Sequence, residues 1–203
     1  MNGWVELSIA FVTGVLGPLS VIWLKNFLDK RKKKPDMLHD ALKVGELVMS
    51  KIEHIRDEIN CDRVWVTQFH NGGNFYPTGK SMAKFSMIYE VVGPNTNSKQ
   101  NSFKNLPVNL FSKSINQLFE NDIIEISDFK DDSIATYGLK YIAEETNCKS
   151  QYIFAIKSLD NKFIGTLGID YTKRKTKLDM ETINHLSVHA ATLGGVLMNH
   201  LKQ

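Results

Sequence analysis

The chain opens with a long apolar run, and later segments alternate regularly between apolar and polar residues. Residues 4–24 read WVELSIAFVTGVLGPLSVIWL, in which Glu6 is the only charged residue. At 1.5 Å of rise per residue, a helix of this length spans roughly 31 Å, close to the roughly 30 Å of a bilayer's hydrocarbon core. The pattern therefore predicts one transmembrane helix.

The residues that flank this run are those expected at a membrane interface. Trp4 and Trp23 stand near its two ends, where aromatic rings prefer to lie. A basic segment follows, made of Lys25, Lys30, Arg31, Lys32, Lys33 and Lys34. Because basic segments stay on the cytoplasmic side and bind anionic lipid, we expect a single-pass protein of the inner (plasma) membrane, with its N-terminus outside and its domain cytoplasmic. A buried soluble helix and an interfacial anchor are the alternatives.

Residues 36–59 carry one narrow apolar stripe. Its members recur at alternating steps of three and four: Leu38, Ala41, Gly45, Val48, Ile52, Ile55 and Ile59. This spacing predicts a helix, which we interpret as a linker over residues 35–60 that pairs two copies as a parallel coiled coil. The side chains expected to pair are Leu38, Val48, Ile52, Ile55 and Ile59. An amphipathic helix that packs on its own domain is the alternative.

The remaining residues, 61–203, alternate between strand-like and helix-like segments. Strands are predicted at 63–69, 82–92, 123–126, 151–157 and 163–171, and helices near 107–120, around 134–145 and from about 179 to 202. The last two strands are separated by a polar turn of hairpin length. This order predicts an α+β domain with a largely antiparallel sheet.

The last third of the chain resembles the end of a GAF domain. The segment SLDNKFIGTLGIDYTKRKTKLDMETINHLSVHAATLGGVLMNHL has a turn, a strand of the form IG-x-L-x-I, a polar connection and a closing helix. The element order from residue 36 onward agrees with that family. The resemblance implies a GAF-like antiparallel sheet with helices on both faces and a small-molecule pocket on one face. It also implies that the first and last helices pack together on the other face and pair two domains.

Charge and cysteine usage exclude several functions. The basic segment accounts for the net charge of +3, and the remainder is close to neutral, so nucleic acid is not an expected partner. Cys61 and Cys148 are too few for a disulfide framework and do not have metal-ligand spacing. They also do not reproduce the cysteines of the methionine-sulfoxide reductases that share the GAF fold. The Asp-Glu pair of the family's cyclic-nucleotide signature occurs only at Asp57-Glu58, in the linker helix.

The stretch VTQFHNGGNFYP is the first candidate for a ligand site. His70 is predicted to end the first strand, and the glycines that follow to begin a loop that reaches Lys80. Long loops with polar side chains often bind ligands. The predicted ligand-binding set is His70, Asn71, Gly72, Gly73, Tyr76, Lys80 and Tyr89. In the alternative interpretation, Asn71-Gly72 only makes the turn and His70 caps the sheet edge.

No catalytic constellation and no metal site is predicted. No nucleophile has a base at a recognisable spacing, and no phosphate-binding glycine loop opens a helix. His185 and His189 are four residues apart and could bind a metal with further ligands, but a solvated pair is the favoured interpretation. The basic cluster Thr172–Lys177 is interpreted as a solvated loop, with a contact to lipid headgroups as the alternative.

These patterns together indicate a regulatory module. We expect a membrane-anchored, non-enzymatic GAF-like sensor or docking module that forms a homodimer, contacts membrane lipid and binds a small molecule. The sequence identifies no cofactor. The alternative is a membrane interaction protein without a ligand, such as a holin-like lysis protein of a bacteriophage.

Overall fold

The computed structural model describes residues 3–4, 10–31, 37–75, 77–131 and 137–201. The chain forms two compact units, Met1–Met37 and Leu38–Gln203. The second unit contains both the predicted linker helix and the predicted domain. The linker helix is therefore part of the domain and not a separate segment.

The first unit is helical where it is described. A π-helical turn, η1 (Val12–Leu16), leads into α2 (Gly17–Arg31), and Trp23 stacks on Phe27 with ring centroids 5.4 Å apart. Among the described residues, no helix combines the length and the apolarity needed to cross a membrane. The predicted span over 4–24 includes residues 5–9, and the predicted lipid contacts include Lys32, Lys33 and Lys34. Residues 5–9 and 32–34 lie outside the described residues.

The second unit is built on a six-stranded sheet with the order β3-β2-β1-β6-β5-β4, in which every pair of neighbours is antiparallel. The strands are β1 (Arg63–Phe75), β2 (Lys80–Val92), β3 (Leu106–Pro107), β4 (Ile123–Ile126), β5 (Ser150–Lys157) and β6 (Phe163–Tyr171). The helices are α3 (Met37–Ile59), η2 (Val108–Phe111), α4 (Ser112–Asn121), α5 (Tyr137–Thr146) and α6 (Met180–Leu201). The predicted α+β class and the antiparallel sheet are confirmed.

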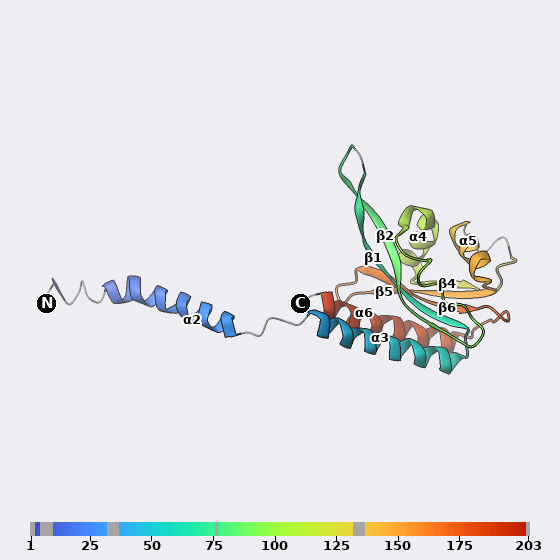
Figure 1. Ribbon diagram of the computed structural model, residues 1–203, viewed down its shortest axis with the longest axis horizontal. Helices are drawn as coiled ribbons and strands as arrows, with labels where there is room; N and C mark the ends of the chain where they lie inside the picture. Colours follow the sequence, from blue (N-terminus) through green and yellow to red (C-terminus); the bar gives the residue numbers. More distant parts are fainter. Residues whose placement is uncertain (1–2, 5–9, 32–36, 76, 132–136, 202–203) are drawn as a thin grey trace. The chain divides into compact units, whose positions relative to one another are not determined.

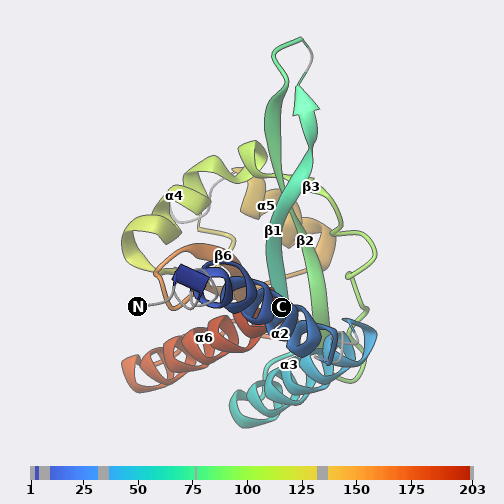
Figure 2. The same cartoon turned by 90° about the vertical axis from the view of Figure 1, so that its left-hand side faces the viewer.

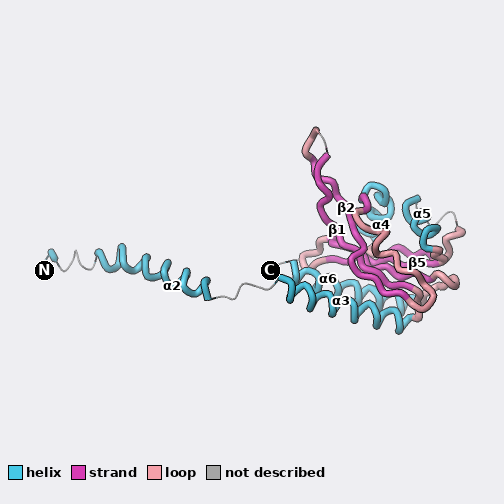
Figure 3. Tube along the Cα trace, in the orientation of Figure 1, coloured by secondary structure: helices cyan, strands magenta, loops and turns pink. Residues whose placement is uncertain are grey.

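Helices cover both faces of the sheet. Helices α3 and α6 lie side by side on one face, and α4 and α5 lie on the other (Figure 1). Strands and helices separate clearly into these layers when coloured by type (Figure 3). Because side chains alternate along a strand, β1 sends Val64 and Val66 toward α3 and α6 and sends Trp65 toward α4 and α5. Two apolar cores result, one on each face.

The apolar stripe of α3 serves the domain's own core. Val48, Ile52 and Ile55 are fully buried within a single chain, where they pack with strand residues and with α6. At Gly45 an added Cβ would lie 3.9 Å from the Tyr89 ring, an ordinary van der Waals contact, so this position of the stripe faces the sheet and has room for a Cβ. These residues fit the alternative interpretation, an amphipathic helix that packs on its own domain, better than they fit the seam of a coiled coil. Leu38, by contrast, is 70% exposed.

The first two strands extend well beyond the rest of the sheet. Pairing of β1 with β6 stops at Gln68, whereas pairing with β2 continues to Phe75. The result is a two-stranded ribbon that projects from the domain (Figure 2). The prediction that His70 ends the first strand is therefore wrong. The glycines form a β-bulge between Asn71 and Asn74, where Gly73 takes a φ of +100°, and the turn comes later.

Candidate functional site

Two predicted ligand residues of the ribbon, His70 and Asn71, form hydrogen bonds with serines of the neighbouring strand. His70 Nε2 lies 2.9 Å from Ser86 Oγ, and Asn71 Oδ1 accepts hydrogen bonds from the Ser81 hydroxyl at 2.6 Å and from the Gly73 amide at 3.3 Å. These contacts close the ribbon on itself. The alternative interpretation, in which Asn71-Gly72 makes the turn, is wrong, because both residues lie within β1.

Of the remaining members of the predicted set, Lys80 lies on the ribbon, where it pairs with Phe75, and Tyr89 lies away from it. Tyr89 is half-buried in the core under α3, and burial raises the pKa of its hydroxyl. Lys80 begins β2, and Tyr76 lies outside the described residues. The structure therefore brings His70, Asn71, Gly72 and Gly73 together on the ribbon and places Tyr89 elsewhere. Ligand binding by this set stays a prediction.

The sheet face under α4 and α5 is the face on which the family resemblance places a pocket. Here the space is filled by side chains. Trp65, Met87 and Phe103 are buried there, and the cavity that they line with Arg63 and Thr146 measures only about 30 Å³. A volume of this size accommodates about one water molecule.

A larger cavity lies at the end of the sheet, between α5 and the connections that precede α5 and α6. Its volume is about 560 Å³. Five basic side chains line it, against only two acidic ones, Asp128 and Glu144. The basic residues are Lys130, Lys140, Lys149, Arg174 and Lys175. We call this cavity the basic pocket.

Hydrogen bonds hold the walls of the basic pocket in place. Lys175 forms an ion pair with Asp128, and this contact, with the Lys130 amide, lowers the pKa of the Asp128 carboxyl. Lys149 donates to the Lys173 carbonyl at 2.7 Å. Lys173 itself forms an ion pair with Asp62 at 2.9 Å. The cluster Thr172–Lys177 is thus bound to the domain and is not a freely solvated loop.

Both cysteines are buried thiols. Burial raises the pKa of Cys61 to about 12 and also raises that of Cys148, which lines the basic pocket. A thiol with a raised pKa is a poor nucleophile, because the thiolate is the reactive form. Both thiols are free, in line with a chain that has too few cysteines for a disulfide framework.

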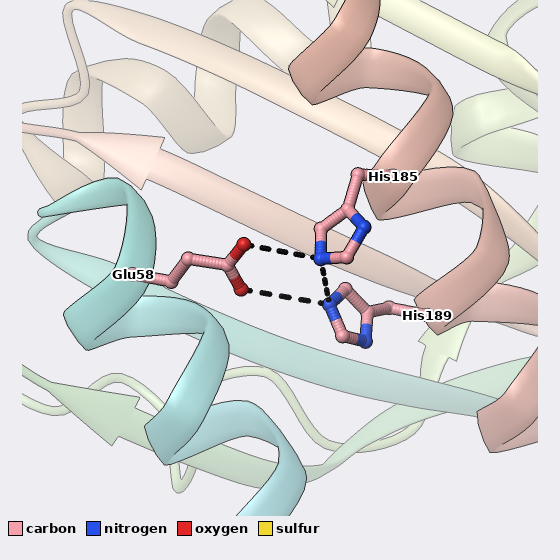
Figure 4. A group of neighbouring side chains, drawn as sticks. All are labelled: Glu58, His185 and His189. Carbon is pink, nitrogen blue, oxygen red and sulfur yellow. Dashed lines mark hydrogen bonds and ion pairs between the residues drawn. The ribbon is translucent and has the colours of Figure 1, made fainter.

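The closing helix places His185 and His189 against Glu58 of α3 (Figure 4). Glu58 Oε1 lies 3.0 Å from His185 Nε2, and Glu58 Oε2 lies 3.6 Å from His189 Nε2. The two Nε2 atoms are 3.0 Å apart. Burial and the nearby Lys51 lower the pKa of His189, which favours its neutral form. These three residues are the group in the described part of the chain that is best placed to hold a metal ion.

Sequence reasoning recognised only part of these sites. The spacing of His185 and His189 was visible, but their contact with Glu58 was not, because it depends on how α3 and α6 pack. The basic pocket was visible only as the cluster Thr172–Lys177. Lys130 and Lys140 join that cluster through the fold and through no local motif.

The fold can be compared with those of solved proteins. Neither a protein-family model nor a curated protein matches the sequence. The blue-light-absorbing form of the PixJ GAF domain from Thermosynechococcus elongatus matches with a TM-score of 0.62 at 13% identity, over 82% of this chain and 92% of that chain. The second unit has the fold of a GAF domain.

Two further solved structures are similar to this chain. A far-red-absorbing dark state with bound biliverdin IXa matches with a TM-score of 0.60 at 14% identity, over 81% of this chain and 98% of that chain. A domain of a putative two-component sensor histidine kinase from Sinorhizobium meliloti matches with a TM-score of 0.51 at 15% identity, over 73% of this chain and 87% of that chain. The family resemblance inferred from the sequence is confirmed for the fold. Sequence identities this low support no conclusion beyond the fold.

Proposed function

We propose that this chain is a membrane-anchored, non-enzymatic sensor module whose GAF-fold domain binds a small anionic molecule in the basic pocket. One observation carries the proposal: a cavity of about 560 Å³ lined by five basic and two acidic side chains. Ligand sites commonly have volumes of roughly 300–1,000 Å³. The excess of positive charge favours an anion over a neutral or cationic ligand.

The chemistry of the lining narrows the class of ligand. The planar guanidinium of Arg174 can bind two oxygens of one carboxylate or phosphate, whereas lysines act as point charges. A ligand with two or more negative charges, such as a phosphorylated metabolite, can engage several of these side chains together. A bilin is not proposed, since the space under α4 and α5 measures about 30 Å³ and the basic pocket is lined by charges.

The first experiment is native mass spectrometry of the full-length chain, followed by thermal-shift measurements with a panel of nucleotides, sugar phosphates and dicarboxylates. We expect at least one polyanion to raise the melting temperature in a saturable way. The Lys130→Ala/Lys140→Ala variant should weaken that ligand at least about tenfold, because each charge-assisted contact contributes about 1.5–3 kcal/mol.

The matched control is Lys113→Ala/Lys162→Ala. It removes two exposed lysines that do not line the basic pocket. Equal weakening in both variants would indicate nonspecific charge attraction and would contradict the proposed site. An absence of binding by every polyanion in the panel would contradict the anionic ligand.

Membrane anchoring is the second part of the proposal. It rests on the apolar run from Trp4 to Leu24 and on the basic segment that follows. Within the described part of this run, Leu19 and Ile22 are each 56% exposed, so their apolar surface is available to lipid. We propose the orientation expected from the basic segment, with the domain in the cytoplasm.

Cell fractionation tests the anchor. The full-length chain should sediment with membranes, and Val12→Arg/Val15→Arg, near the centre of the run, should release it, because an arginine at a helix centre opposes insertion by about 2.5–3.5 kcal/mol. The control is Leu159→Arg, at a leucine that is 82% exposed in the β5–β6 turn. Permeabilisation of the membrane on expression would favour the holin-like alternative over a sensor.

Pairing of two copies is the third part. Leu38 and Leu42 are 70% and 58% exposed and lie one turn apart on α3. We propose that these side chains, rather than the buried part of the stripe, contact a second copy of the chain.

A further inference from the structure

We propose that Glu58, His185 and His189 form a site for a divalent transition-metal ion of the Zn²⁺ class. Two imidazole nitrogens and one carboxylate oxygen make up the donor set (Figure 4). Such a set suits Zn²⁺ and its neighbours in the first transition row, whereas Ca²⁺ and Mg²⁺ prefer ligands that are all oxygen. This site is separate from the basic pocket and does not depend on the sensor proposal.

The spacing of the donor atoms fits one shared ion. Zn–N and Zn–O bonds of about 2.0–2.1 Å in a tetrahedron place the donor atoms roughly 3.3 Å from one another. The two Nε2 atoms are 3.0 Å apart, and the Glu58 carboxylate lies 3.0 Å from His185 Nε2 through Oε1 and 3.6 Å from His189 Nε2 through Oε2. An ion can therefore bond to both nitrogens and to the carboxylate with small adjustments of the side chains.

Hydrogen bonding alone does not account for these separations. His185 Nε2 is equally close to the Glu58 carboxylate and to His189 Nε2, at 3.0 Å each. A ring nitrogen carries one hydrogen at most, and it cannot point at both neighbours. A metal ion instead uses the lone pair of each Nε2 atom and a carboxylate oxygen, so all three atoms can converge on one point.

The backbone elements hold the donors rigidly. His185 and His189 lie one turn apart on α6, which brings both rings to the same side of the helix. The His189 side chain is only 7% exposed, so its surroundings fix its position. Glu58 comes from the last turn of α3. A bound ion would therefore join the first and last helices of the GAF-fold domain.

The site has an entry path and room for a further ligand. A surface depression of about 490 Å³ is lined by Glu58, His185 and Glu181, together with Ile59, Leu178 and Thr182. Three protein ligands leave the fourth tetrahedral position open to water or to another small donor. His54 Nε2, one turn before Glu58, lies 3.6 Å from Glu58 Oε2 and borders the same group.

Calorimetric titration with Zn²⁺ tests the proposal on the full-length chain, purified without a histidine tag and stripped with a chelator. We expect about one ion bound per chain. His185→Ala and Glu58→Gln should each weaken binding by at least 10–100-fold, the loss typical even of residues that only support a ligand. Both side chains are partly exposed, so these variants should keep their fold, which circular dichroism will verify.

The matched control is His39→Ala, at an exposed histidine near the start of α3. It should bind Zn²⁺ with the affinity of the parent chain. A second readout is the visible spectrum of bound Co²⁺, which reports tetrahedral nitrogen and oxygen ligation and should be lost in His185→Ala. Absence of binding in the parent chain, or unchanged binding in the Glu58→Gln/His185→Ala double variant, would overturn the proposal.

Discussion

Arg63 Nη1 lies 2.9 Å from Asp170 Oδ2, and both side chains are only 2% exposed. The same guanidinium places Nε 3.0 Å from Glu90 Oε1. Asp170 also accepts hydrogen bonds from Trp65 Nε1 at 3.0 Å and from Gln151 Nε2 at 2.8 Å. Four adjacent strands are thus connected by one buried polar network on the face that α4 and α5 cover.

Removal of the arginine should destabilise the domain strongly. In Arg63→Met, two buried carboxylates lose their counter-charge, and we expect the free energy of unfolding to fall by about 3–5 kcal/mol. Urea denaturation followed by tryptophan fluorescence measures this change. The exposed pair Lys162–Asp160, whose side chains are 77% and 50% exposed, provides the control. Lys162→Met should change stability by less than about 1 kcal/mol, and a comparable loss in both variants would contradict the role of the network.

Gly168 should tolerate no side chain, because Trp65 covers it. A Cβ atom at Gly168 would lie 2.0 Å from the indole ring of Trp65, its partner across β1 and β6. Gly168→Ala must displace this ring, and we expect a loss of about 1–3 kcal/mol in the free energy of unfolding.

Gly195 is the matched control for this substitution. It lies within α6, and an added Cβ there meets nothing within 4 Å. Gly195→Ala should be neutral or stabilising by about 0.5–1 kcal/mol, since alanine is the better helix former. Thermal unfolding of both variants measures the contrast. Equal destabilisation would show that the Trp65 contact is not the cause.

Association of two copies should depend on the exposed leucines of α3. Leu38→Glu/Leu42→Glu places two charges where we propose that a second copy packs. Sedimentation velocity of the full-length chain in detergent should show a dimer for the parent chain and a monomer for this variant. Leu47→Glu, at a leucine that is 60% exposed on the same helix, is the control and should stay dimeric. A parent chain that sediments as a monomer would contradict the dimer itself.

Strong periodicity made most of the fold predictable. The strands β5 (Ser150–Lys157) and β6 (Phe163–Tyr171) were predicted to within one residue, because one or both of their faces are buried and the apolar pattern ends where the strand ends. The ribbon of β1 and β2 lacks this signal. From His70 onward β1 pairs only with β2 and belongs to neither core, so its sequence carries no apolar pattern and the strand was predicted to end at His70.

The candidate sites were less predictable, because they depend on contacts between distant segments. The α3 stripe shows the limit clearly. Its spacing fits a coiled coil and an amphipathic helix equally well, and only the position of the sheet decides that Val48 and Ile52 are internal. The role of Glu58 could not be predicted either, because it depends on how α3 packs beside α6.

Alkaline pH should destabilise the domain through its buried thiols and phenol. In the folded state, burial raises the pKa of Cys61 from 9.0 to about 12, and it also raises the pKa of Tyr171 above its usual 10.0. Between pH 9 and about 12 the unfolded chain therefore binds fewer protons than the folded chain, so the free energy of unfolding falls as the pH rises. Urea midpoints at about pH 8 and about pH 10 should show this loss, and Cys61→Ala should make it smaller. A midpoint that does not change over this interval would mean that Cys61 titrates normally and is open to solvent in the folded chain.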